Sequence, residues 1–289
     1  MRPQDYRNFD AELAYLGSLP GVEVHMYSHF IELPLLAELF RLLQEWRGFS
    51  SFRWLIFSRQ HAPELIRTPL DEDTVLFYMS NEDGVLPDFY SQLRCVFTPD
   101  LKLELAAPRV HLIPLGCNGD VPEVPWIPWP QRQLDVFFSG QVLPRRSAFI
   151  MQAIQLLFDL QPHLELQAQI QLTPRFRTGM DPETYSRTLM NSRIALIPPG
   201  FSPITLRMFE AMRCGCLLVT CDMPDFWYLH GLPRLVMPLS WEGLSDQVLA
   251  ILENQEMQLK LHAQTQKHYL GHCTPQAIVR FIKNQLDPP

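Results

Sequence analysis

Residues 193–222, RIALIPPGFSPITLRMFEAMRCGCLLVTCD, decide the fold that this sequence predicts. We expect a buried strand over 193–197 and a Pro-Pro-Gly-Phe-Ser loop over 198–202. A helix over 202–214, a glycine turn at 215 and a second buried strand over 216–220 follow. A helix that joins two apolar strands over such short connections is typical of a parallel βαβ unit. We therefore expect an α/β domain whose ligand lies beyond the carboxyl ends of its strands.

The loop and helix of this segment combine features of an anion site. If the helix begins at Ser202, the amides of Gly200, Phe201 and Ser202 lie at its N-terminus, where free N–H groups and the helix dipole favour negative charge. The dipole mildly disfavours a cation there, so Arg207 is best explained by an external anion such as a diphosphate. The alternative is an ordinary surface ion pair between Arg207 and Glu210, three residues apart.

Strands and helices alternate on both sides of this segment. Expected strands in the second half also include 134–139 and 164–172, and the expected helices are 146–160, 182–191, 244–253, 256–269 and 274–286. Expected strands in the first half are 22–28, 52–58, 74–80 and 95–98, with a helix over 34–46. The pattern predicts two α/β domains, 1–132 and 133–289, with mainly parallel sheets. Residues 114–132 hold five prolines and two tryptophans and are the expected linker.

Composition narrows the classes of function. The chain is 47% hydrophobic and 19% charged, which is ordinary for a globular protein. A net charge of −7 offers no basic face for nucleic acid, so an anionic ligand has to be held by a few placed cations and amides. The N-terminus has no signal-peptide pattern, and no run of about 18 apolar residues could span a bilayer. We expect a soluble, cytoplasmic protein whose six cysteines are reduced.

The central segment resembles the core motif of the exostosin family of glycosyltransferases, and equally that of bacterial spore-coat-type glycosyltransferases. The matching residues are Tyr185, Leu189, 192–196, Pro199, Gly200, 205–211, Gly215 and Cys216. The resemblance implies a GT-B fold, two Rossmann-like domains facing a cleft, with this half binding the nucleotide sugar. It implies that Glu210 binds the ribose and Arg207 faces the diphosphate. At the position of Thr205 these families commonly have a serine, and threonine supplies the same hydroxyl group.

A second element agrees with this resemblance. The strand DVFFSG, ending at Gly140, is followed six residues later by Arg146, as in the opening strand of the same families. Gly140 would let the backbone approach a phosphate, and Arg146 would supply a bidentate guanidinium, a role that Arg145 could also take. The resemblance covers residues 134–281, about half of the chain. The acceptor-side assignment of the first half rests on analogy between folds.

Transfer with inversion needs a base near the acceptor hydroxyl, on a loop after a strand of the first domain. The candidates are Asp83 and Glu82, which follow the strand 74–80, and His29, which follows the strand 22–28; we favour the carboxylates. Their alternative role is turn formation, since Glu-Asp-Gly is common turn chemistry.

We expect no metal and no cofactor besides the nucleotide sugar. Residues 71–73 match a DxD pattern, but they precede a strand, whereas metal-binding DxD motifs follow one. His268, His272 and Cys273 lack a fourth zinc ligand, and we expect Gly271 to interrupt their helix. No dinucleotide-binding, P-loop or hydrolase motif occurs.

The sequence thus predicts a metal-independent glycosyltransferase that moves a sugar from a nucleoside diphosphate to an acceptor hydroxyl on a glycan or another molecule. The alternative is a catalytically silent protein of the same fold that binds nucleotide sugars or glycans.

Overall fold

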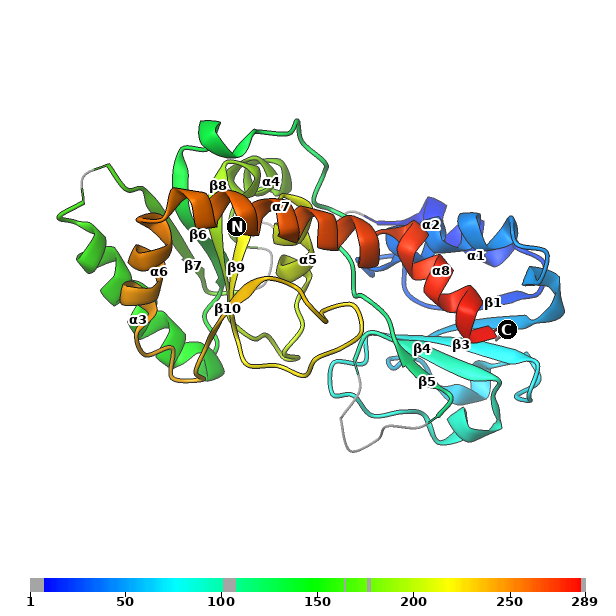
Figure 1. Cartoon of the computed structure of the whole chain (residues 1–289). Coiled ribbons are helices and arrows are strands. Elements are labelled where there is room, and N and C mark those ends of the chain that lie inside the picture. Colours follow the sequence, from blue (N-terminus) through cyan, green and yellow to red (C-terminus); the bar gives the residue numbers. More distant parts are fainter. Residues whose placement is uncertain (1–7, 101–107, 164, 176–177, 287–289) are drawn as a thin grey trace. The chain divides into compact units, whose positions relative to one another are not determined.

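The structure, a computed structural model, describes residues 8–100, 108–163, 165–175 and 178–286. The chain divides into two units: unit 1 comprises Met1–Asp120 with Cys273–Pro289, and unit 2 comprises Val121–His272. Each unit contains one five-stranded, fully parallel sheet covered by helices (Figure 1). The predicted α/β class with two Rossmann-like sheets is confirmed.

Unit 1 has the strand order β1-β2-β3-β4-β5. Its strands are β1 (Val22–His25), β2 (Arg53–Ser58), β3 (Thr74–Met79), β4 (Cys95–Thr98) and β5 (Val110–Leu112), and its helices are α1 (Asp10–Ser18), α2 (Leu33–Gln44) and α8 (Pro275–Leu286). Every residue of the central strand β3 is buried, as the continuous apolar run TVLFYM requires when helices cover both faces of a parallel sheet. The sequence missed α1 and β5, and β1 ends three residues earlier than expected.

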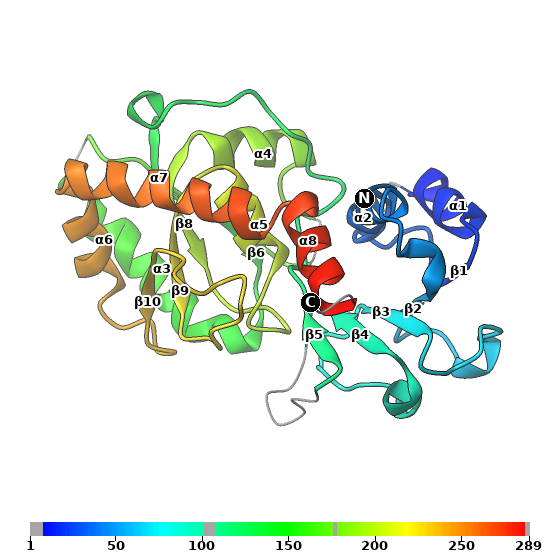
Figure 2. The same ribbon diagram turned by 45° about the vertical axis from the view of Figure 1, so that its right-hand side comes forward.

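Unit 2 has the strand order β10-β9-β8-β6-β7. Its strands are β6 (Leu134–Gln141), β7 (Ala168–Thr173), β8 (Ser192–Ile197), β9 (Leu217–Cys221) and β10 (Arg234–Met237), and its helices are α3 (Ser147–Leu160), α4 (Pro182–Met190), α5 (Leu206–Arg213), α6 (Leu244–Leu252) and α7 (Gln255–His272). Figure 2 shows α7 running across this unit. Alternate side chains of β6 face opposite layers. Phe138 packs with Phe149 of α3, whereas Phe137 contacts Tyr185 of α4.

The boundary between the units differs from the expected one at 132/133. Residues 121–132 belong to unit 2 because their end is anchored there. The Arg132 guanidinium is fully buried, donates to the carbonyl oxygens of Ser192 (2.7 Å) and Cys214 (2.5 Å), and lies over the rings of Trp126 and Trp129. The proline-rich segment is therefore fixed onto the second sheet by a cation that makes two kinds of contact, hydrogen bonds to carbonyl oxygens and cation–π contacts.

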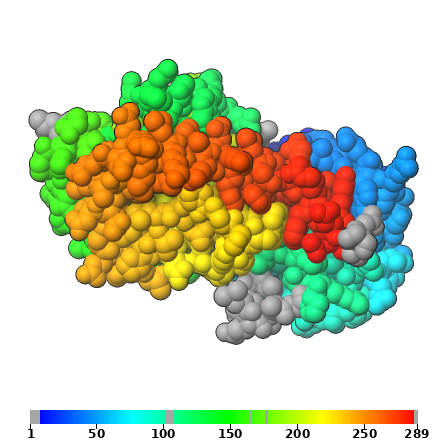
Figure 3. Space-filling view, viewed as in Figure 1, coloured from blue at the N-terminus to red at the C-terminus, as the bar shows by residue number. Residues whose placement is uncertain are grey.

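The C-terminal helices also differ from expectation. Helix α7 continues through Gly271, so the expected interruption there was wrong; its outer face forms part of the surface in Figure 3. The chain then enters unit 1, where α8 packs against α2 and buries Ile278 and Ile282 in the core. Thr274 caps this helix, its hydroxyl accepting from the Ala277 amide.

Candidate functional site

The order of the second sheet defines where a ligand is expected. From β6 the chain moves to β7 on one side and then crosses back to β8 on the other, so the topology reverses between β6 and β8. In open parallel sheets, ligands bind at the carboxyl ends of the strands at this reversal point. There, β6 ends at Gly140 and Gln141, and β8 leads into Pro198 and Pro199.

Arg146 bridges the two strand ends. Its Nε donates to the Pro199 carbonyl oxygen (2.7 Å) and one terminal nitrogen donates to that of Gln141 (2.9 Å). The side chain is only 6% exposed. Burial, with the nearby charges of Arg207 and Arg145, lowers its pKa to about 10, so the guanidinium stays charged at neutral pH.

Arg207 lies beside it. Its Nε and a terminal nitrogen both donate to the Ser139 carbonyl oxygen, at 3.0 and 2.6 Å, and the guanidinium carbon lies 4.8 Å from the centre of the Phe138 ring. A Cβ atom on Gly140 would collide with this guanidinium. The predicted glycine therefore makes room for Arg207, a function that the sequence did not suggest.

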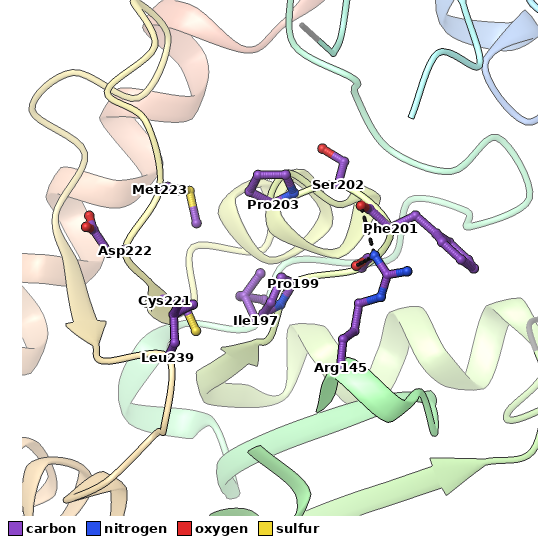
Figure 4. Close-up of a pocket in the computed structure, with 11 residues that line it drawn as sticks. Arg145, Ile197, Pro199, Phe201, Ser202, Pro203, Cys221, Asp222, Met223 and Leu239 are labelled. Carbon is purple, nitrogen blue, oxygen red and sulfur yellow. Dashed lines mark hydrogen bonds between the residues drawn. The ribbon is translucent and has the colours of Figure 1, made fainter. Parts of the chain in front are cut away.

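Arg145 completes a cluster of three guanidinium groups. It donates to the carbonyl oxygens of Gly200 and Phe201, both at 3.1 Å, and stacks on the exposed Phe201 ring (Figure 4). Within the described part of the chain, no carboxylate forms an ion pair with Arg145, Arg146 or Arg207. Clustered cations whose partners are carbonyl oxygens and aromatic rings keep their full positive charge, which favours the binding of an anion.

A cavity of about 240 Å³ adjoins the cluster. Its lining comes from the ends of β8 and β9, from the loop between β8 and α5, and from the segments that follow β6, β9 and β10: Arg145, Ile197, Pro199, Gly200, Phe201, Ser202, Pro203, Cys221, Asp222, Met223 and Leu239 (Figure 4). Three of the predicted donor residues, Gly200, Phe201 and Ser202, thus line one cavity.

The predicted start of the following helix was wrong. Helix α5 begins at Leu206, because Thr205, directly before it, has extended backbone angles (φ −134°, ψ 152°). The Gly200 amide donates within the loop, to the Ser202 carbonyl oxygen at 2.9 Å. The amides of Gly200, Phe201 and Ser202 therefore do not lie at the N-terminus of the helix, as we had expected.

Thr205 has an unexpected property. Its hydroxyl oxygen is buried and has no hydrogen-bond partner in the described part of the chain. Its methyl group would lie 3.2 Å from a Cβ on Gly200, so the hydroxyl is held close to the loop that lines the cavity. A buried hydroxyl without a partner is rare in proteins, and a ligand oxygen is one way to satisfy it.

Glu210 lies one turn further along α5. It is 3% exposed, and its carboxylate accepts a hydrogen bond from the Tyr185 hydroxyl at 2.7 Å. Burial, together with the Glu210 charge, raises the Tyr185 pKa well above its usual value, so the phenol remains a donor. The alternative of an exposed Arg207–Glu210 pair does not hold, because Glu210 is inside the protein. Tyr185 belongs to the sequence motif, but its partner was not foreseen.

The predicted base candidates belong to unit 1. Asp83 forms an ion pair with Arg59 and accepts from the Val85 amide at 3.4 Å, while Glu82 is exposed. Gly84 has a left-handed φ of 65° and its amide closes a turn onto Asn81 at 2.8 Å. Residues 81–84 therefore form the turn that was the alternative to a catalytic role for Asp83 and Glu82.

The other sites weighed from the sequence have ordinary partners. His268 donates from Nε2 to the Tyr228 carbonyl oxygen (2.8 Å) and stacks on His272. Asp71 pairs with Arg53. Over the described ranges, no group of three or more His, Cys, Asp or Glu side chains is arranged to hold a metal, all six cysteines are free, and no helix has the length and apolarity of a membrane span.

Comparison with solved structures agrees with the predicted fold. Two Rossmann-like units, each with a parallel five-stranded sheet, are the components of the GT-B fold, and the chain resembles solved structures with that fold. No family model matches the chain, and no curated protein matches it in sequence.

The individual matches are distant. A structure of a GtfA/B complex superimposes with a TM-score of 0.51 at 11% identity over 90% of this chain, and the chain spans 60% of that protein's length. A glycosyltransferase from Rickettsia africae ESF-5 gives 0.49 at 11% identity, covering 88% of this chain and 82% of that one. HepE from Anabaena, bound to UDP and glucose, gives 0.47 at 13% identity, covering 88% and 76%. At such identities the likeness concerns the fold.

Proposed function

We propose that the protein is a glycosyltransferase that moves a sugar from a nucleoside diphosphate to an acceptor hydroxyl. The observation that carries the proposal is the cluster of Arg145, Arg146 and Arg207 at the reversal point of the second sheet, with no carboxylate paired to it in the described part of the chain. A diphosphate is a dianionic group of the size that two or three guanidinium groups can bind.

In this proposal the arginines act on the leaving group. As the bond between the sugar and the diphosphate breaks, negative charge grows on the phosphate oxygens, and fixed cations at that position lower the barrier. Arg146 and Arg207 supply this charge without a metal ion. The Thr205 hydroxyl donates to a phosphate oxygen, which satisfies its hydrogen-bonding capacity.

Glu210 is proposed to orient the nucleotide ribose. Its carboxylate has a fixed position because Tyr185 donates to one of its oxygens, and it follows Arg207 by one helical turn. The spacing of these residues supports the exostosin-like or spore-coat-type subdivision. Asp83 and Glu82 stand as the carboxylate candidates for activating the acceptor hydroxyl.

The direct test is nucleotide binding. A thermal-shift screen with UDP, GDP, ADP and dTDP, and with their sugar conjugates, is expected to find selective stabilisation by one base through linkage. Arg207→Gln should abolish that shift. Arg187→Gln is the matched control, because Arg187 is exposed in unit 2 and pairs with Glu183 one turn away on α4. Equal responses of the two variants would refute the proposed site.

A catalytically silent nucleotide-sugar or glycan-binding protein is the second candidate. It is favoured by the ion pair that already engages Asp83. Such a protein would bind the nucleotide and release none from its sugar conjugate, so a nucleotide-release assay separates the two functions.

A further inference from the structure

Several histidine and aromatic side chains gather at the carboxyl ends of the first two strands of unit 1. His25 ends β1, and Ser58 ends the neighbouring strand β2. The His61 ring lies 6.2 Å from that of His25 and 4.3 Å from that of Tyr27. In open α/β sheets, ligands bind outside the carboxyl ends of the strands. Asp83 and Glu82, the residues chosen from the sequence, do not belong to this group.

The central contact is a carboxylate–imidazole pair. The Glu23 carboxylate lies 2.6 Å from Nε2 of His25, and it also accepts from the backbone amides of Arg67 (2.8 Å) and Thr68 (2.5 Å). Burial acts to raise the Glu23 pKa, but the hydrogen bonds from Thr68, Arg67 and His25 outweigh it and lower the pKa to about 2. Glu23 is therefore ionised at neutral pH and can only accept.

This network fixes the tautomer of His25. Since the carboxylate cannot donate, Nε2 of His25 carries the proton, and Nδ1 is left with a free lone pair. Within the described part of the chain, Nδ1 has no hydrogen-bond partner, and the side chain is 16% exposed, so it is within reach of a small group. An imidazole oriented by a carboxylate, with the opposite nitrogen open, is the arrangement of a general base.

The neighbouring rings form one side of this site. His61 shares a hydrogen bond with the Ser58 hydroxyl (2.8 Å), and burial, together with the charge of His25, lowers its pKa, which keeps it neutral. Tyr27 lies against His61, is 44% exposed, and stacks on the exposed His29. Exposed aromatic faces next to polar groups suit a sugar ring, whose C–H face is apolar and whose rim carries hydroxyls.

We propose that His25, oriented by Glu23, binds the acceptor hydroxyl and takes its proton, with the acceptor sugar packed on Tyr27. The inference rests on the proposed glycosyl transfer. The hydroxyl oxygen forms a bond to the anomeric carbon, the bond from that carbon to the diphosphate breaks, and the diphosphate leaves with the electron pair. The proton passes to Nδ1 of His25, and the resulting imidazolium is stabilised by the Glu23 carboxylate until water removes the proton.

This assignment explains the pair better than a structural role does. The titratable groups around His25 are Glu23 on the same strand and His61 after β2, with Tyr27 beyond it. The Glu23 carboxylate stabilises the protonated form of His25, whereas a positive charge on His61 would destabilise that form. The lowered pKa of His61 keeps its ring neutral, so this repulsion is avoided. Asp83, by contrast, already has a cation, Arg59, as its partner.

The test uses the full chain with the nucleotide sugar that stabilises it and a methyl glycoside as acceptor. His25→Ala and His25→Gln are expected to lower kcat by about 10²- to 10⁴-fold and leave the affinity for the corresponding nucleoside diphosphate unchanged. Added imidazole should restore much of the activity of His25→Ala. Glu23→Gln should lower kcat and also lower the pH at which activity reaches its plateau, because the variant no longer stabilises the protonated imidazole of His25. His230→Ala is the matched control, because His230 is an exposed histidine of unit 2.

Nitrogen-15 NMR of the imidazoles supplies a readout that does not depend on turnover. We expect His25 in the Nε2-protonated form, with its Nδ1 signal shifted by the methyl glycoside. An Nδ1-protonated His25, wild-type turnover in both His25 variants, or loss of activity without rescue by imidazole would each overturn the inference. Absence of nucleotide binding by the wild-type protein would instead refute the proposed function, and the glycoside-induced shift would still test this site.

Discussion

Replacing Gly140 by alanine perturbs the candidate site through a single added methyl group. Gly140 lies in β6 and its backbone is not left-handed, so alanine fits the main chain. The new Cβ would overlap the Arg207 guanidinium and approach the Phe138 ring to 3.0 Å. Because Arg207 is the flexible partner, we expect its guanidinium to move while the strand stays in place.

The size of the effect follows from what Arg207 loses. Displacement breaks its two hydrogen bonds to the Ser139 carbonyl oxygen and its contact with the Phe138 ring. Overpacking of this kind costs about 1–3 kcal/mol of stability. A guanidinium that no longer meets the diphosphate removes a charge-assisted contact of about 1.5–3 kcal/mol, which corresponds to roughly a 10- to 150-fold loss of nucleotide affinity.

Two measurements separate these effects. Urea unfolding gives the change in stability, and isothermal titration with the stabilising nucleoside diphosphate gives the change in affinity. Gly271→Ala is the matched control, because Gly271 lies in α7 of the same unit and a Cβ there would have nothing within 4 Å. Alanine in a helix should stabilise this variant by up to about 1 kcal/mol and leave affinity unchanged.

The reasoning fails if Gly140→Ala binds the nucleotide as tightly as the wild-type protein. That result would mean that the guanidinium of Arg207 does not contact the ligand, or that the close approach to Gly140 is absent. A loss of affinity in Gly140→Ala but not in Arg207→Gln would also contradict it, since the glycine is proposed to act through the arginine.

Three further predictions concern buried polar groups. Tyr185→Phe removes a donor from the buried Glu210 carboxylate and should cost about 1–3 kcal/mol of stability, measured by urea unfolding, together with weaker nucleotide binding. Arg132→Met should destabilise by about 2–4 kcal/mol because it leaves buried carbonyl oxygens unpaired, and it should speed hydrogen exchange in residues 121–132. The lowered pKa of Glu23, about 2 when folded, stabilises the protein above its unfolded pKa near 4.5. That contribution, at most about 3 kcal/mol, should be lost as pH falls from 5 to 2, and Glu23→Gln should flatten this part of the curve of unfolding free energy against pH.

The sequence by itself determined the class of fold. Most central strands contain continuous apolar runs, such as VLFYM in β3 and IALI in β8, and such runs are visible without knowledge of their neighbours. The edge strands β5 and β10 were missed, because short strands with partly exposed residues carry no apolar run and no clear alternation. Arg146 and Arg207 were chosen as candidates because of their positions in segments that resemble glycosyltransferase motifs.

Only the tertiary structure decided what the candidate residues contact. The start of α5 at Leu206 depends on the backbone angles of Thr205, which the Ser-Pro pattern does not specify. Gly140 leaves space for Arg207, which lies 67 positions later in the sequence. Glu210 accepts a hydrogen bond from Tyr185, which lies 25 positions earlier. His25 and His61 come together because β1 and β2 pair in register. Periodicity reports how each segment is buried, whereas contacts between segments depend on register and packing, which become defined only when the sheets form.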